Sequence, residues 1–181
     1  MPIAYSRPGL SRMIGATTVA TPGFALAQAQ NVTETIAYGV EAAGTLHTGD
    51  WNTVIGYQAA QGANAFDDCT VVGWQSAQNL PEGTSGATVV GTGVVVAADD
   101  VVVVGPYAEG HAFGAVSVGT NAEAWQDRSV AVGSQAVVVN DSGQYAVAIG
   151  QASEAGGTEG IAIGSSAKAW TAASLGGYYG G

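Results

Sequence analysis

The chain has few basic residues. Its 181 residues include four Lys and Arg against fourteen Asp and Glu, which gives a formal net charge of −10. A protein this acidic repels phosphate backbones, so nucleic acid is excluded as a partner. Cys69 is the only cysteine, so the chain cannot form an internal disulfide.

Long apolar runs are also missing. The valine run at positions 101–104 has four residues, far short of the roughly 20 that a transmembrane helix needs, so we expect no membrane partner. Charged residues make up only 10% of the chain while hydrophobic residues make up 47%. The sequence therefore has an excess of apolar side chains without a segment that could span a bilayer.

What the sequence does contain is a glycine that recurs after short apolar runs. The steps between successive glycines are 14 residues in the regular units and 17 or 18 in the others. A fixed period indicates a solenoid, and the extra residues of the longer units belong in loops. The repeating glycines are Gly56, Gly73, Gly91, Gly105, Gly119, Gly133, Gly150 and Gly164.

The residues before each glycine alternate in size. In the regular units Val or Ile stands one and three positions before the glycine, with a residue between them that is often Ala or Ser. This period-2 pattern predicts a short strand, and an Ala three residues after the glycine would begin a second one. We expect the side chains just before the glycine to form the core of the coil or the contact between chains: Val104, Val118, Val132, Ile149 and Ile163.

Two strands and two corners in about 14 residues describe one coil of a narrow parallel β-roll. About nine coils, with a weaker first copy at residues 35–39, would stack roughly 4.8 Å apart into a rod of roughly 40 Å. So thin a coil buries little apolar surface within one chain. The surplus is predicted to pack against further copies of the same chain.

These repeats resemble the head repeats of trimeric autotransporter adhesins. The resemblance rests on the units SVAVG, YAVAIG and GIAIG, with Ala three residues beyond the glycine, and covers residues 35–169. It implies an all-β fold, a parallel left-handed β-roll, and a homotrimer. Similar repeats occur in bacteriophage fibre and spike proteins, where an N-terminal segment attaches the rod to the particle.

The first 30 residues lack the repeat. They contain three prolines, two arginines and no acid, so a segment of formal charge +2 precedes a rod of −12. We predict an extended attachment arm over residues 1–30 and a β-roll with a short Gly/Tyr tip over residues 31–181. The alternative for the first segment is a secretory signal that ends near Ala27. The predicted contact residues of the arm are Tyr5, Arg7, Arg12, Met13 and Phe24.

Only a Gly/Tyr segment follows the last repeat, which favours a trimeric head fibre or capsid decoration protein on the virion surface. Its arm would dock on the major capsid protein or another virion protein. The alternative is a tail fibre or a bacterial adhesin head that binds a host-surface glycan or protein. An ice-binding threonine array is less favoured, because the aligned threonines stop at Thr88. The aromatic residues that could contact a ligand are Trp125, Trp170, Tyr178 and Tyr179.

Residues suited to catalysis or metal binding are sparse. His47 and His111 fall four coils apart and cannot share a site within one chain. Asp residues recur six positions before the glycine, where a carboxylate can cap a turn, and this explanation is favoured over a calcium ladder. We therefore predict no enzymatic activity, no cofactor and no metal site. The recurring acids are Asp50, Asp67, Asp99 and Asp127.

Overall fold

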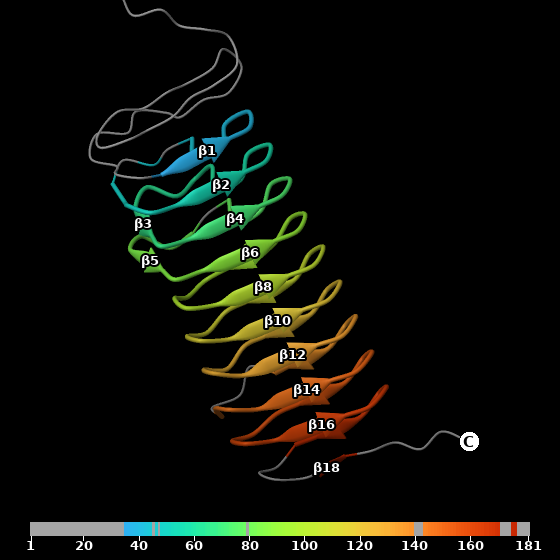
Figure 1. The fold of residues 1–181 in the computed structure, drawn as a ribbon. Coiled ribbons are helices and arrows are strands. Elements are labelled where there is room, and N and C mark those ends of the chain that lie inside the picture. The colour runs from blue at the N-terminus through green and yellow to red at the C-terminus, as the bar shows by residue number, and fades with distance from the viewer. Residues whose placement is uncertain are drawn as a thin grey trace, which may run out of the picture.

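A computed structural model describes residues 35–44, 46, 48–78, 80–139 and 143–170, with the backbone of 175–176. Within these ranges every regular element is a short β-strand, and the chain winds into a stack of similar coils (Figure 1). The same part of the chain has no helix that could cross a membrane. The predicted arm and the Gly/Tyr tip lie outside the described residues.

The first strand of each coil joins one long parallel sheet. Ten strands follow one another in coil order, each paired with the strands of the coils before and after it. They are β1 (Ile36–Tyr38), β2 (Thr53–Ile55), β4 (Thr70–Val72), β6 (Thr88–Val90), β8 (Val102–Val104), β10 (Val116–Val118), β12 (Val130–Val132), β14 (Val147–Ile149), β16 (Ile161–Ile163) and β18 (Leu175–Gly176).

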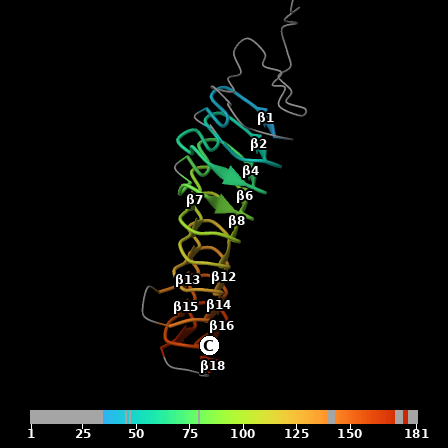
Figure 2. The same cartoon turned by 90° about the vertical axis from the view of Figure 1, so that its left-hand side faces the viewer.

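The second strand of each coil joins a shorter parallel sheet on the opposite side of the rod (Figure 2). Most of these strands follow the predicted alanine, as β9 follows Ala108, whereas β7 and β15 follow Val94 and Ser153 at the same position of the coil. The six strands are β7 (Val95–Val96), β9 (Glu109–Gly110), β11 (Glu123–Ala124), β13 (Val137–Val138), β15 (Glu154–Ala155) and β17 (Lys168–Ala169). The early coils add a separate two-stranded pair, β3 (Phe66–Asp67) and β5 (Thr84–Ser85).

The middle residue of each three-residue strand points into the coil. Ser117, Ala131 and Ala148 are 0% exposed, and the Ser117 hydroxyl donates a 2.7 Å hydrogen bond to the carbonyl oxygen of Ala122. Since one coil encloses only a thin interior, small residues fit there. The earlier coils, whose corners are longer, also bury the larger side chains of Leu46 and Phe66.

This arrangement corrects one expectation about the core. The residues just before the glycine do not fill the interior of their own coil, because the alternation of the strand turns them outward. Val104, Val118 and Val132 are half-buried, while Ile149 and Ile163 are 38% and 49% exposed. Their contact with other chains stays a prediction.

The recurring glycine is required by the backbone geometry at this corner of the coil. Gly119 has φ +138°, and a Cβ at this position would overlap the carbonyl oxygen of Gly133 in the next coil. The same overlap with the glycine of the following coil would occur at Gly56, Gly105 and Gly133. Adjacent coils therefore approach one another through bare backbone at this corner, which only glycine permits.

The extra residues of the longer coils lie in corners, as predicted. Residues 40–44, 57–62 and 74–78 form turns that widen the rod beside β1, β2 and β4. The turns of the first two coils are held in register by hydrogen bonds such as that from the backbone N–H of Ala43 to the carbonyl oxygen of Ala59, 2.8 Å.

Candidate functional site

The outer face of the ten-stranded sheet carries two in-register columns of β-branched side chains. Val118 is paired with Val104 before it and with Val132 after it, and the column continues to Ile149 and Ile163. The structure thus brings these five predicted residues together in one line. The neighbouring column consists of Thr53, Thr70, Thr88, Val102, Val116, Val130, Val147 and Ile161.

From β8 to β16 this face carries only Val and Ile side chains and no charged residue. Such a surface can recognise another apolar surface by shape, and long contiguous apolar patches are uncommon on monomeric proteins. Its chemistry provides neither a nucleophile nor a proton donor. The face is therefore a candidate protein interface.

The outer face of the six-stranded sheet is polar by contrast. Glu109, Glu123 and Glu154 point outward from β9, β11 and β15. Glu154 forms an ion pair with Lys168, with 2.6 Å between Oε2 and Nζ. The two sheets therefore present different chemistry on opposite sides of the rod.

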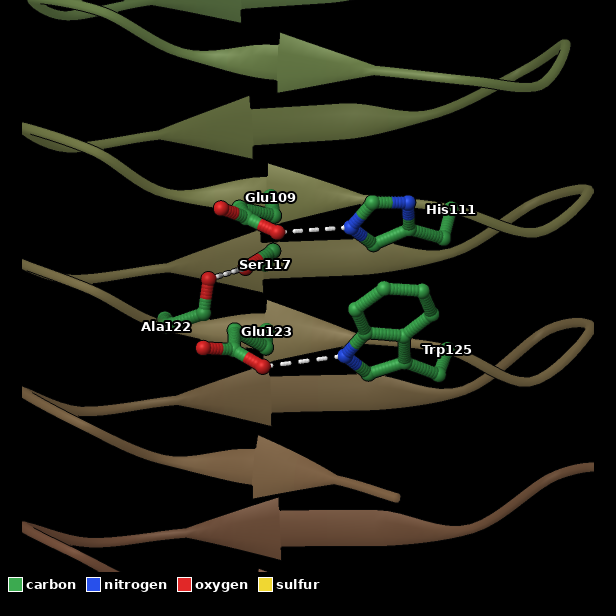
Figure 3. A network of polar contacts seen from close by, with 6 residues as sticks. All are labelled: Glu109, His111, Ser117, Ala122, Glu123 and Trp125. Atoms are coloured by element: carbon green, nitrogen blue, oxygen red, sulfur yellow. Dashed lines mark hydrogen bonds and ion pairs between the residues drawn. The ribbon is translucent and has the colours of Figure 1, made fainter. Parts of the chain in front are cut away.

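On this polar face the structure pairs two residues that sequence reasoning treated separately. The rings of His111 and Trp125 stack with centroids 3.5 Å apart and planes 7° from parallel. Each ring nitrogen contacts the glutamate two residues earlier: His111 Nε2 lies 2.7 Å from Glu109 Oε2, and Trp125 Nε1 donates to Glu123 Oε2 at 3.0 Å (Figure 3). The signal for this pair was present, because both residues stand six positions after their coil glycine.

Trp125 and Trp170, the two predicted ligand-contact residues that the structure describes, differ in how exposed their rings are. One face of the Trp125 ring is covered by His111, and the residue is half-buried. Trp170 is 54% exposed, and the Lys168 Nζ lies 5.9 Å from the centroid of its ring. Tyr178, Tyr179 and the five arm residues (Tyr5, Arg7, Arg12, Met13 and Phe24) lie outside the described part of the chain, as does His47.

A second aromatic pair occurs at a long corner. The rings of Tyr57 and Trp74 lie 6.3 Å apart and 12° from parallel. Beside them, Gln58 Nε2 donates to Glu41 Oε2 at 2.6 Å, and Gln75 Nε2 donates to Gln58 Oε1 at 2.8 Å. Side chains at equivalent positions thus form ladders that tie the first coils together.

The repeated aspartates cap backbone, as predicted, but the partner belongs to the preceding coil. Asp67 Oδ1 accepts from the backbone N–H of Asp50 at 2.7 Å, and Asp127 Oδ1 accepts from that of Phe113 at 3.2 Å. Asp99 makes the same contact with Ser85. Among the described residues no three His, Cys, Asp or Glu side chains gather in a way that could hold a metal ion.

Cys69 is buried against the first coils. Its thiol lies 3.0 Å from the carbonyl oxygen of Asp67, and desolvation by burial raises the pKa of Cys69 to about 11. The thiol is therefore protonated at neutral pH, which makes it a poor nucleophile.

Comparison with known proteins finds one family. The YadA head domain repeat matches in two copies, at residues 112–136 and 142–171. No curated protein and no solved structure matches the chain. The matched segments contain β10 to β12 and β14 to β17.

Proposed function

Because the chain carries head repeats of the trimeric autotransporter adhesin type, we propose that it forms a trimeric, surface-exposed fibre head that attaches to another surface. The observation that supports this most directly is the outer face of the ten-stranded sheet. Two columns of Val, Ile and Thr run along it without a break in register.

We expect a trimer because it would bury this apolar face against the same face of two other chains. Three rods that turn these columns toward a common axis bury apolar side chains that a single coil leaves half-exposed. The polar sheet with its glutamates then faces outward. The acidic charge keeps such fibres soluble and separate.

The oligomer can be tested with two matched substitutions. Val132 and Val137 are both half-buried valines, on β12 of the ten-stranded sheet and on β13 of the six-stranded sheet. We expect Val132→Lys to shift the protein from trimer to monomer in sedimentation-equilibrium runs, because three ammonium groups would meet at the interface. Val137→Lys should leave a trimer, since its neighbours Glu123 and Glu154 are acidic. Equal masses for both variants would contradict the assignment of the face.

The attachment function requires a ligand on a host cell or extracellular matrix. Purified trimer should bind cells with a saturable dependence on concentration, and the monomeric Val132→Lys variant should bind at least about tenfold more weakly because avidity is lost. Trimer that binds no cell surface would argue against the adhesive role.

A virion setting is the second candidate, and one observation favours it. The first 30 residues carry only positive charge ahead of an acidic rod, which suits docking on a partner of opposite charge. In this reading the partner is a major capsid protein or another virion protein, and the rod projects from the capsid exterior. Assays of host-cell binding and capsid binding on the same preparation distinguish the adhesive function from the virion function.

A further inference from the structure

A hollow opens on the polar sheet near the C-terminal end of the described rod. It is lined by Gln135 and Val137 from one coil, Ala152 from the next, and Ser166 and Lys168 from a third. Gln135, Ala152 and Ser166 occupy equivalent corner positions, each with φ between +52° and +59°. At this position the middle coil has a methyl group where the coil before it has a Gln side chain.

The lining combines apolar and polar groups. Val137 and the Ala152 methyl are apolar, while the exposed Gln135 and Ser166 supply amide and hydroxyl groups. At the edge the Lys168 Nζ contacts Glu154 Oε2 at 2.6 Å, so the two charges of the hollow compensate each other. A ligand with an apolar side and several hydroxyl groups matches this lining better than an ion does.

An aromatic platform continues the site. Trp170 lies two residues beyond Lys168, about 7 Å along the chain, and half of its surface is exposed. The Lys168 Nζ lies 5.9 Å from the ring centroid, so the Lys168 side chain both lines the hollow and lies near the indole. The electron-rich face of an indole attracts the polarised C–H groups of a sugar ring.

We propose that this surface binds a neutral oligosaccharide, with one sugar in the hollow over Ala152 and a neighbouring sugar against Trp170. The site deepens the adhesive function proposed above and rests on it. Anionic glycans are disfavoured because the rod is acidic and the single ammonium group already contacts a carboxylate. The surface also lies on the sheet opposite the proposed trimer interface, so assembly leaves it free.

Two substitutions at Ala152 give a matched test. Ala152→Gln fills the hollow with the residue that occupies the equivalent position at Gln58, Gln75 and Gln135, all with φ between +51° and +59°. Ala152→Ser copies Ser166, with φ +55°, and leaves the hollow open. Both changes keep a backbone geometry that the chain already uses, so both variants should fold.

The experiment uses the full chain with lactose, N-acetyllactosamine and chitotriose as neutral probes, and sialyllactose as the anionic one. Saturation-transfer NMR should detect at least one neutral probe. Ala152→Gln and Trp170→Ala should each weaken its binding about tenfold, and Ala152→Ser should change it less than about twofold.

Three results would overturn the proposal: no binding of any neutral probe, preference for sialyllactose, or equal affinity of the wild type and Ala152→Gln. Cell binding measured in parallel separates this site from the broader function. If cells bind the wild type and Ala152→Gln equally and no neutral probe distinguishes the two proteins, the adhesive function stands and the sugar site is wrong. If no cells bind but the neutral probe distinguishes the variants as expected, the sugar site stands and the adhesive function is wrong.

Discussion

At the scale of single residues, the coil is held together by positions where side chains must be absent or small. Gly119 and its equivalents allow neighbouring backbones to touch. Ser117, Ala131 and Ala148 fill the thin interior of the later coils, at the position where the earlier strands bury Val54, Val71, Val89 and Val103. The stability of the coil therefore depends on the absence of large side chains at these positions as much as on the apolar area that the coil buries.

Two glycines of adjacent corners make a matched comparison. Gly119→Ala should lower the free energy of unfolding by at least about 2 kcal/mol, because the added Cβ overlaps the next coil at φ +138°. Gly114→Ala should cost about 1 kcal/mol, since φ is +65° and the nearest atom is the Arg128 Cγ at 3.4 Å. Thermal unfolding by circular dichroism measures both, and equal losses would mean that the glycine column is not limited by backbone overlap.

Cys69 gives a prediction about pH. Burial raises its pKa from 9.0 to about 11, so the folded state holds the thiol proton more tightly than the unfolded state does. This contribution to stability is complete below pH 9 and is lost as the pH rises toward 11. Chemical unfolding between pH 8 and 11 should show the loss, and Cys69→Ala should remove that part of the slope. A thiol that reacts with a disulfide reagent as fast in the native protein as in guanidinium would contradict the burial.

At the scale of elements, the sequence pattern predicts strand positions well and side-chain direction poorly. Glycine spacing and alternation located the first strand of each coil and the second strand of the later coils. In the early coils Ala59, an expected start of a second strand, lies in a turn instead. The direction was wrong because alternation does not say which of its two faces points inward; the narrow interior decides this by admitting the smaller residue, as at Ala131. The stacking of His111 on Trp125 was also missed, since it requires the exact register of β9 on β11.

The repeat should tolerate loss of one complete unit. Deletion of residues 120–133 joins Gly119 to Ser134 and preserves the order of inward and outward positions, so a shorter rod with the same circular dichroism per residue is expected. Deletion of residues 121–133 removes one residue fewer, and the next strand should then lose its pairing register. Limited proteolysis compares the two; equal resistance would mean that register is not set by the 14-residue unit.

At the scale of the whole molecule, the two sides of the rod have separate roles in our proposals: the ten-stranded sheet for assembly and the six-stranded sheet for ligand. Sequence reasoning predicted association from the surplus of apolar residues, but could not place it on one side without the observed pairing of Val118 with Val132. The sugar site could not be predicted because it depends on a short side chain at Ala152 lying between its neighbours in space.

The predicted arm can be tested at this scale. Protein without residues 1–30 should keep its β-rich spectrum and its oligomeric state, because the coils supply their own pairing. If the protein decorates a virion, this deletion should abolish co-sedimentation with capsids that the full chain binds. Capsid binding that survives the deletion would exclude the arm as the attachment segment.

The direction of the backbone hydrogen bonds has a mechanical consequence. The bonds that join the coils, such as that from the Gly119 N–H to the carbonyl oxygen of Val104 at 2.8 Å, run along the axis of the rod. A pull on the two ends therefore loads one coil junction at a time, as in opening a zipper, rather than many bonds together. Under flow, a tethered fibre of this kind should lengthen in small successive steps and absorb work before its attachment breaks.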